Sequence, residues 1–205
     1  MTQAEIFTES EGNKWHERNK DKPRLPDPVL ETIRRLDLRP QNVLELGCGT
    51  GWRLAEIKPG PKRHCRGYDP SEEAVKARVF EHVYKASALE ALRLIAGGFY
   101  DIIIFGFCLY LVDREELLQI AGHADRALRD GGHIVIHDFV PEYSYKRPYE
   151  HKEGLWSFKM DHSKLWLSHP SYRLVEMTST GEDDERVGVT VLKKDMSTGF
   201  PVREI

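Results

Sequence analysis

The stretch VLELGCGTGWRL, residues 43–54, places three glycines within five residues. An apolar run precedes the glycines and predicts a strand, and WRLAEI, which follows Gly51, predicts a helix. At a strand-to-helix turn, residues without a Cβ let a ligand rest against the backbone, near the N–H groups of the helix terminus. Gly47, Gly49 and Gly51 therefore indicate a nucleotide-type binding loop, unless they form only a tight turn.

The same order, a strand followed by a helix, recurs on both sides of this loop. Asp27 and Pro28 mark the start of a helix before it, as an N-cap and a first helical residue. Asp113 with Glu116 predicts a capping box for a later helix, whose apolar side includes Leu118. Further strands are expected near residues 66–68, 82–86, 100–107, 133–139, 172–180 and 186–194, the last two joined as a hairpin.

Alternating strands and helices that end in a hairpin predict an α/β fold. We expect a Rossmann-like doubly wound sheet of seven strands, mostly parallel, with an antiparallel C-terminal hairpin. Residues 1–26 are predicted to form an N-terminal arm or lid, and residues 27–205 a single domain. Residues 141–170 are too long for an ordinary connection and are predicted to be a functional insertion. Ligands of such sheets bind at the carboxyl ends of the strands.

Composition narrows the class of protein. The chain has 205 residues, 40% of them hydrophobic, and a formal net charge of −3, which lacks the basic excess of a general nucleic-acid binder. Cys48, Cys65 and Cys108 show no metal-ligand spacing, so neither a metal site nor a disulfide framework is expected. The N-terminus has no apolar leader segment, and the apolar run 102–112 is too short to span a bilayer. We therefore expect a cytoplasmic protein without membrane contact.

The spacing of the glycines separates two kinds of cofactor loop. In a dinucleotide-binding loop the third glycine comes one residue later, where Trp52 stands in this chain and would crowd the phosphates. ELGCGTG after an apolar strand instead resembles the first motif of the class I S-adenosylmethionine-dependent methyltransferases. The resemblance covers about residues 28–140 and the hairpin. It is carried by Glu45, Gly67-Tyr68-Asp69, Ala86-Ser87-Ala88, Tyr100-Asp101 and Leu128-Arg129-Asp130-Gly131-Gly132.

This resemblance implies S-adenosylmethionine as the cofactor and assigns its parts to the loop and strand ends. The methionine part would lie over the glycines and the ribose against Asp69, which also stands where an acid can accept hydrogen bonds from both ribose hydroxyls. Proteins of this family often have an aspartate near the adenine amino group, and this chain has Ser87 near that position. A serine hydroxyl or a backbone N–H is left for the adenine contact. The implied cofactor-binding residues are Glu45, Gly47, Cys48, Gly49, Gly51, Asp69, Pro70, Ser87, Ala88 and Phe105.

Methyl transfer is an in-line displacement, so the protein must align the acceptor and, for an oxygen nucleophile, supply a base. His137 and Asp138, at the end of the predicted fifth strand, are candidate bases, as is His162 in the insertion. Instead of acting as bases, His137 could be a histidine hydrogen-bonded within the sheet, and Asp138 could have the structural role of holding a neighbouring loop. His133 would lie about 13 Å from His137 by strand rise, too far to share one metal. Cys108 is either a covalent nucleophile or, more commonly, a buried thiol.

The insertion is rich in aromatic and cationic side chains, which suit a ring or an acidic group of an acceptor. Packing over the sheet edge or against a second subunit of a homodimer would use the same residues. The candidate acceptor-binding residues are Phe107, Tyr110, Tyr145, Arg147 and Trp156.

The predicted function is O- or N-methylation of a small metabolite or a sugar-containing precursor, with a small-molecule acceptor as the partner. An RNA or protein methyltransferase is the first alternative, since Lys14, Arg18, Lys20, Lys22 and Arg24 give the arm a basic run, although such a run is usually solvated. A non-catalytic S-adenosylmethionine-binding regulator and a nicotinamide dehydrogenase are the others.

Overall fold

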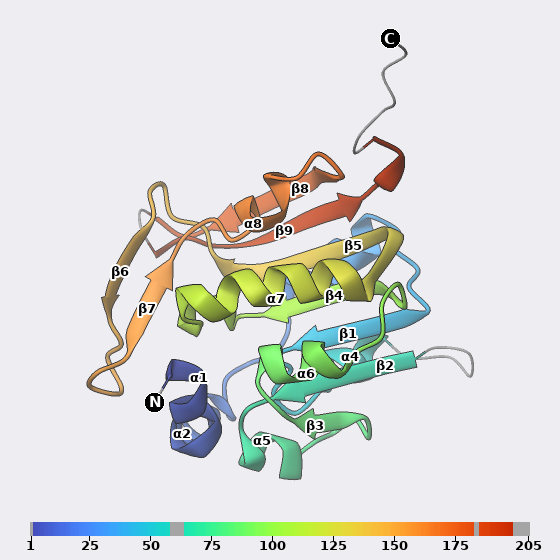
Figure 1. Cartoon of the computed structure of the whole chain (residues 1–205). Coiled ribbons are helices and arrows are strands. Elements are labelled where there is room, and N and C mark those ends of the chain that lie inside the picture. The colour runs from blue at the N-terminus through green and yellow to red at the C-terminus, as the bar shows by residue number, and fades with distance from the viewer. Residues whose placement is uncertain (1, 58–63, 183–184, 199–205) are drawn as a thin grey trace.

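Seven strands form one sheet in the order β3-β2-β1-β4-β5-β9-β8 in the computed structural model, which describes residues 2–57, 64–182 and 185–198 (Figure 1). The first five strands in this order are parallel, and β9 is antiparallel to both β5 and β8. The predicted fold class is therefore confirmed. The strands are β1 (Asn42–Leu46), β2 (His64–Asp69), β3 (Val83–Lys85), β4 (Tyr100–Gly106), β5 (Leu128–Phe139), β8 (Tyr172–Thr180) and β9 (Val187–Lys194).

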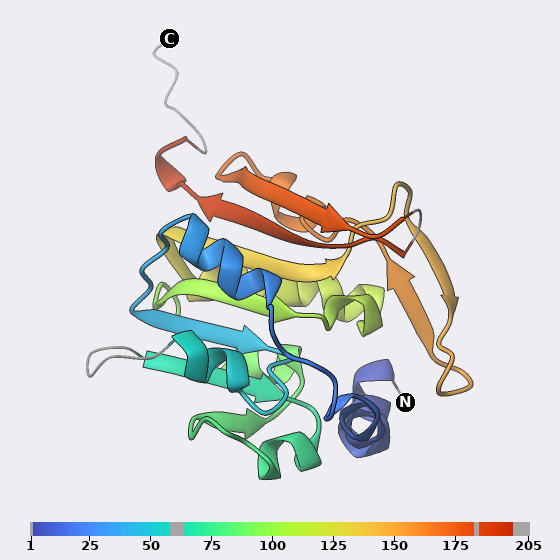
Figure 2. The same ribbon diagram turned by 180° about the vertical axis from the view of Figure 1, so that it is seen from behind.

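Helices cover both faces of this sheet. In Figure 1, α6 (Ala88–Leu94) and α7 (Arg114–Ala127) lie in front of the strands. Figure 2 shows α3 (Pro28–Arg35) and α4 (Trp52–Ile57) on the opposite face. The short helix α5 (Glu72–Lys76) follows β2 and packs against β3. The central strands are consequently buried on both sides, as their unbroken apolar sequences require.

Alternate residues of each central strand enter different cores. Leu44 and Ile103 pack in the core under α6 and α7, whereas Val43, Ile102 and Ile104 pack in the core under α3 and α4. All five side chains are at most 1% exposed. Successive side chains of a strand point to opposite faces, so an all-apolar strand can serve two cores at once.

The start and the end of α7 differ from the sequence prediction. Asp113 is the N-cap, but its side chain makes no capping hydrogen bond and accepts the N–H of Gln3 instead, at 2.9 Å. The predicted capping box is therefore wrong. Leu118, expected on the apolar side, is 56% exposed, and Ile120 takes its place in the core. The helix ends at Ala127, and β5 begins at Leu128, earlier than the strand expected at residues 133–139.

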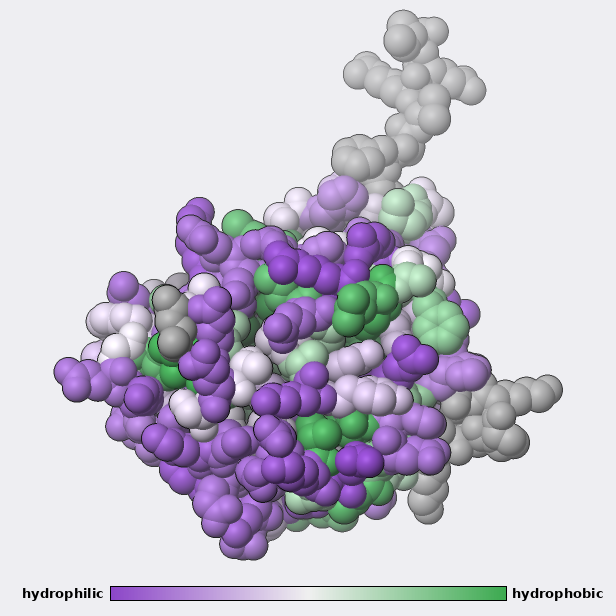
Figure 3. Space-filling view, turned by 60° about the horizontal axis from the view of Figure 1, so that its bottom comes forward, coloured by the Kyte–Doolittle hydropathy of each residue, from purple (hydrophilic) through white to green (hydrophobic). Residues whose placement is uncertain are grey.

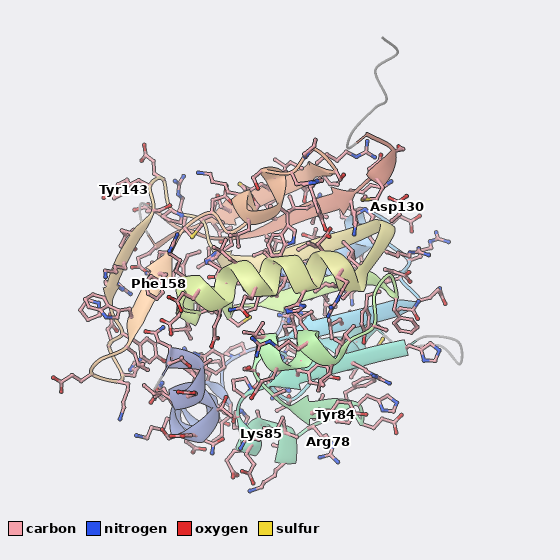
Figure 4. All side chains as sticks on the ribbon, in the orientation of Figure 1. Arg78, Tyr84, Lys85, Asp130, Tyr143 and Phe158 are labelled. Carbon is pink, nitrogen blue, oxygen red and sulfur yellow. The ribbon has the colours of Figure 1, made fainter. Side chains whose placement is uncertain are left out.

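Two segments gather at the carboxyl ends of the parallel strands (Figures 1 and 2). The N-terminal segment contains α1 (Gln3–Ile6), a π-helical turn η1 (Phe7–Glu11) and α2 (Gly12–Asn19). The predicted insertion contains the antiparallel hairpin β6 (Tyr145–Pro148) and β7 (Trp156–Lys159), followed by α8 (Lys164–Leu167). Figure 4 places Tyr143 and Phe158 on this side and Asp130 at the opposite end of the sheet. Residues 199–205 of the predicted domain lie outside the described residues.

The surface carries mostly hydrophilic side chains on the face drawn in Figure 3, where hydrophobic side chains form separate small areas. Such small areas are normal for a folded domain and do not by themselves mark an interface. Among the described residues, every helix is too short or too polar to cross a membrane.

Candidate active site

The glycine loop after β1 uses its three glycines in two ways. All three have positive φ, at +71° for Gly47, +55° for Gly49 and +75° for Gly51, a conformation that favours glycine. A Cβ on Gly47 would lie 2.8 Å from Cys108 Cβ, and one on Gly51 would collide with Val83. A Cβ on Gly49 would point into open space. Gly49 thus offers bare backbone to a ligand, whereas Gly51 is required for packing and lines neither cavity described below. The cofactor contact of Gly51 stays a prediction.

Asp69 connects the end of β2 to this loop. Its Oδ2 accepts the N–H of Gly49 at 2.8 Å, and its Oδ1 accepts the N–H of Ser71 at 2.9 Å. Burial raises the pKa of the Asp69 carboxyl, and these two backbone hydrogen bonds act in the opposite direction. A carboxylate has about four acceptor positions, so Asp69 can still receive hydroxyl donors from a ligand.

A cavity of about 770 Å³, including its open mouth, begins at Asp69. Pro70 and the start of α6 form one wall, and Leu111, Val112 and Ile120 form another. The N-terminal segment closes it with Phe7 and Trp15. We call this space the apolar cavity. Ser87 and Ala88, both predicted cofactor-binding residues, lie on its wall together with Pro70.

A second cavity of about 1240 Å³, again including its open mouth, lies over the glycine loop. Residues 47–50 form its floor, and Trp52, Phe107 and His137 stand around it. The chain between α2 and α3 adds Lys20, Lys22 and Arg24, so we call this space the basic cavity. Within the described ranges, no carboxylate lies within ion-pair distance of Lys22 or Arg24.

Phe107 lies where the two cavities meet. Its backbone has φ +60°, which is unusual for a residue with a side chain, and its N–H donates to the carbonyl of His137 at 2.8 Å. The Phe107 ring packs 5.0 Å from Tyr110, 5.1 Å from Phe139 and 5.5 Å from His137, measured between ring centroids. Strained backbone of this kind persists where the surroundings hold it, and it is frequent at ligand sites.

His137 presents an imidazole to the basic cavity. Burial lowers its pKa to about 4, and the nearby Arg53 guanidinium acts in the same direction. The ring is therefore neutral near pH 7. In the described part of the chain, His137 Nδ1 has no hydrogen-bond partner. A neutral imidazole with an unused nitrogen can accept a proton from a ligand.

Beneath the cavities lies a buried charge network. Arg53 pairs with Glu45 and, at 3.0 Å, with Asp27, and the three side chains are at most 8% exposed. Burial raises the pKa of Glu45 to about 7 although Arg53 lowers it. Glu45 Oε2 has no partner among the described residues, and a Cβ on Gly106 would lie 3.0 Å from Glu45 Oε1. Gly106, which lines both cavities, lies next to this carboxylate.

A family of proteins described as a methyltransferase domain matches residues 15–176 of the chain. The chain belongs to this family. O-methyltransferase 3 of Dictyostelium discoideum is 25% identical to this chain over an alignment of 109 residues. The alignment covers 47% of this chain and 25% of that relative. The chain thus spans about a quarter of the length of this curated relative.

Solved structures share the fold of this methyltransferase. The 1,6-didemethyltoxoflavin-N1-methyltransferase of Burkholderia thailandensis, with its substrate and S-adenosylhomocysteine bound, matches with a TM-score of 0.72 and 16% identity, over 94% of this chain and 88% of that one. An S-adenosylmethionine-dependent methyltransferase from Archaeoglobus fulgidus matches with a TM-score of 0.62 and 16% identity, over 89% and 98%.

S-adenosylmethionine is the cofactor of this methyltransferase, and the described residues fit it. Asp69 keeps acceptor positions for the ribose, and Gly49 leaves room above the loop. Glu45 does not line either cavity; its Oε1 lies next to Gly106 and pairs with Arg53. Cys48 lies on the floor of the basic cavity, as predicted for the loop. Phe105 lines neither cavity, because its side chain is fully buried with its ring centroid 5.6 Å from that of Trp166, and its cofactor contact stays a prediction.

Two of the three candidate bases of the methyltransferase are held away from its cavities. Asp138 is 1% exposed and accepts the N–H groups of Leu109, at 2.9 Å, and Tyr110, at 3.3 Å. It therefore holds the 3₁₀ turn η2 (Leu109–Leu111), which is its predicted structural alternative. His162 is 2% exposed and lines neither cavity, and its role as a base stays a prediction. Of the three, the structure brings His137 alone to a cavity wall.

The predicted acceptor residues of the insertion make contacts within the protein. Arg147 pairs with Glu185 at 2.8 Å, and Lys159 lies over the ring of Tyr145. Lys146 lies over the ring of Trp156, 4.5 Å from its centroid. None of Tyr145, Arg147 and Trp156 lines either cavity, and their contact with the acceptor stays a prediction.

On the far side of the cavities, Tyr110 is 6% exposed and packs behind Phe107. Of the predicted acceptor residues, Phe107 alone reaches the cavities.

The N-terminal segment supplies site residues that the sequence did not indicate. Trp15 lines both cavities, and its side chain hydrogen-bonds to Tyr110. Asn13 Oδ1 accepts hydrogen bonds from Ser71 Oγ, at 2.9 Å, and from the Glu73 N–H, at 3.1 Å, which fixes α2 against the start of α5. A large indole in an otherwise polar segment was the available signal for Trp15.

Proposed function

We propose that this methyltransferase transfers the methyl group to an oxygen or nitrogen atom of a small molecule bound in the basic cavity. The observation that carries the proposal is that the two cavities share the wall formed by Trp15, Gly47, Gly106 and Phe107. A cofactor in one cavity and an acceptor in the other would place their reacting atoms at this wall. In-line transfer needs such an arrangement above all.

The apolar cavity suits the adenosine of the cofactor. Asp69 stands at its inner end for the ribose hydroxyls, and Pro70 and Ala88 offer apolar contacts for the adenine. The methionine part would then run over Gly47 and Gly49 into the basic cavity. This direction brings the cofactor's methyl group beside Phe107.

The basic cavity can bind and orient a ring-containing acceptor. Trp15, Trp52 and Phe107 offer aromatic faces, and Lys22 and Arg24 offer donors at the mouth. Bound S-adenosylmethionine supplies an electrophilic methyl group, and the lone pair of the acceptor displaces the thioether from it. The imidazole of His137, on the wall of the basic cavity, is the proposed acceptor of the proton that the acceptor molecule loses.

The enclosure of the site favours a small acceptor over RNA or protein. We propose that residues 1–26 act as a lid, because their described part covers both cavities. Arg18 and Lys20 are occupied by Glu11 and Glu17, which weakens the case for an RNA-binding arm. The Burkholderia enzyme of the same fold binds 1,6-didemethyltoxoflavin, a small molecule.

Calorimetry and a turnover panel test this proposal. We expect S-adenosylhomocysteine to bind with a micromolar dissociation constant and NAD to show no binding, because the loop lacks the glycine spacing for a pyrophosphate. A panel of hydroxylated and aminated heteroaromatic compounds, assayed for release of S-adenosylhomocysteine, should contain acceptors. Tighter binding of NAD, or turnover with RNA and proteins but not with small molecules, would refute the proposal.

A further inference from the structure

The apolar cavity has a second acidic residue on its wall besides Asp69. Glu116 lies in the first turn of α7 and lines the cavity, and so do Val112, four residues before it, and Ile120, four residues after it. Residues four apart share one face of a helix, so Glu116 and Ile120 face the same space, and Val112 reaches it from the turn before the helix. Ser87, the N-cap of α6, and Ala88 and Leu89 of α6 also line this cavity. Glu116 lines a more polar pocket as well, together with Glu5, Glu90 and Arg93.

Glu116 has no cationic partner where the structure describes the chain. The nearest candidate, Arg93 of α6, donates to the side-chain oxygen of Gln119 at 2.8 Å and forms no ion pair with Glu116. Partial burial raises the pKa of Glu116, the like charges of Asp113, Glu5 and Glu90 raise it further, and the charge of Arg93 lowers it. A half-buried carboxylate among other acids is unfavourable without a donor. A donor on a ligand would remove this cost.

The hydroxyl oxygen and the backbone N–H of Ser87, which the sequence analysis considered for the adenine contact, already form hydrogen bonds within the protein. Ser87 Oγ accepts the N–H of Glu90 at 3.3 Å, and the Ser87 N–H donates to Glu90 Oε2 at 2.8 Å. Together they form the capping box of α6. The Ser87 hydroxyl hydrogen remains for a ring nitrogen, which is an acceptor. An amino group needs an acceptor from elsewhere, and Glu116 supplies one on the same cavity.

We infer that Glu116 selects the base of the cofactor by accepting a hydrogen bond from the exocyclic amino group of adenine. The inference rests on the proposed placement of the adenosine in the apolar cavity. A carboxylate accepts hydrogen bonds only, so it favours adenine, whose amino group donates, and disfavours hypoxanthine, whose carbonyl oxygen at the same position accepts. A glutamine side chain both donates and accepts, so it can satisfy either base.

The test compares S-adenosylhomocysteine with its deaminated analogue S-inosylhomocysteine by calorimetry on the whole chain. We expect the unmodified protein to prefer the adenine compound by about tenfold or more, the range of one hydrogen bond to a charged group. Glu116→Gln should reduce this preference to within about threefold. Glu116→Ala should also abolish most of the preference, and it should weaken the binding of S-adenosylhomocysteine without weakening that of S-inosylhomocysteine. Glu115→Gln, at the exposed neighbouring position of the same helix, should change nothing.

The outcomes separate this inference from the proposed function. If S-adenosylhomocysteine binds but the preference is unchanged in both Glu116 variants, the assignment of Glu116 is refuted and the proposed function stands. If the unmodified protein binds neither compound, the proposed function fails and the assignment fails with it. Circular dichroism of the variants establishes that each is folded before its affinities are compared.

Discussion

Gln3 and Trp156, 153 residues apart in the chain, are joined by two hydrogen bonds through one side-chain amide. Gln3 Oε1 accepts the N–H of Trp156, and Gln3 Nε2 donates to the Trp156 carbonyl at 3.1 Å. The same nitrogen donates to the carbonyl of Leu111 at 2.9 Å. Gln3 is 6% exposed, so these bonds are shielded from water. They connect the N-terminal segment to the β6–β7 hairpin and to the turn after β4.

Gln3→Ala should loosen the N-terminal segment. The substitution leaves backbone groups of Leu111 and Trp156 without partners, at a cost of about 1–3 kcal/mol. Hydrogen exchange at residues 3–19 should become faster, and S-adenosylhomocysteine should bind up to about tenfold more weakly because the open state competes with the closed one. Glu9→Ala, at an exposed position of the same segment, is the control. Equal exchange rates in the two variants would show that Gln3 does not hold the segment.

Asp69→Ala should weaken cofactor binding by about 1–3 kcal/mol through loss of charge-assisted hydrogen bonds to the ribose. Calorimetry with S-adenosylhomocysteine measures the change. Glu81→Ala, at an exposed position after α5, serves as the control. Unchanged affinity in a folded Asp69→Ala protein would remove the assignment of Asp69 to the ribose.

His137→Leu should abolish methyl transfer and leave S-adenosylhomocysteine affinity within about threefold. Because the pKa of His137 is lowered to about 4, its ring is already neutral at pH 5, and kcat/KM should show no loss from its protonation between pH 5 and pH 8. His133→Leu tests the same strand at the opposite end. Full turnover by the His137→Leu variant would exclude this imidazole as the base.

His162 should make the protein sensitive to acid. Burial lowers its pKa from 6.5 to about 4, so between these values the unfolded chain binds the proton and the folded chain does not. Its contribution to the free energy of unfolding is therefore unaffected above pH 6.5 and falls as the pH drops toward 4. His162→Leu should remove this loss and gain about 2 kcal/mol more at pH 5 than at pH 8 in urea unfolding. A gain independent of pH, or equal to that of the exposed His151→Leu, would contradict the assignment.

The sequence predicted those parts of the site that depend on neighbouring residues. Gly47, Gly49 and Asp69 belong to short strand-to-helix connections, whose spacing alone indicates their geometry. The face of the sheet on which Phe105 lies could not be predicted, because β4 is apolar on both faces and its sequence carries no alternation that identifies the side of each residue.

Long-range contacts account for the other differences. Asp113 looked like the first half of a capping box, but Gln3, 110 residues away, uses its carboxylate. Trp156 and Arg147 had the chemistry of a binding surface, yet their partners, Gln3 and Glu185, lie on segments whose positions no local pattern reveals. A composition rich in aromatic and cationic groups cannot distinguish contact with a ligand from contact within the chain.

The shared wall of the two cavities makes their ligands thermodynamically dependent on one another. A cofactor that fixes Trp15 and Phe107 in one conformation in the first cavity changes the shape of the wall that the acceptor contacts in the second cavity. By thermodynamic linkage, the cofactor and the acceptor change each other's binding affinity by the same factor. A substitution at Phe107 therefore alters both binding equilibria and the coupling between them, so the acceptor range of this enzyme cannot be changed at that position without changing its hold on the cofactor.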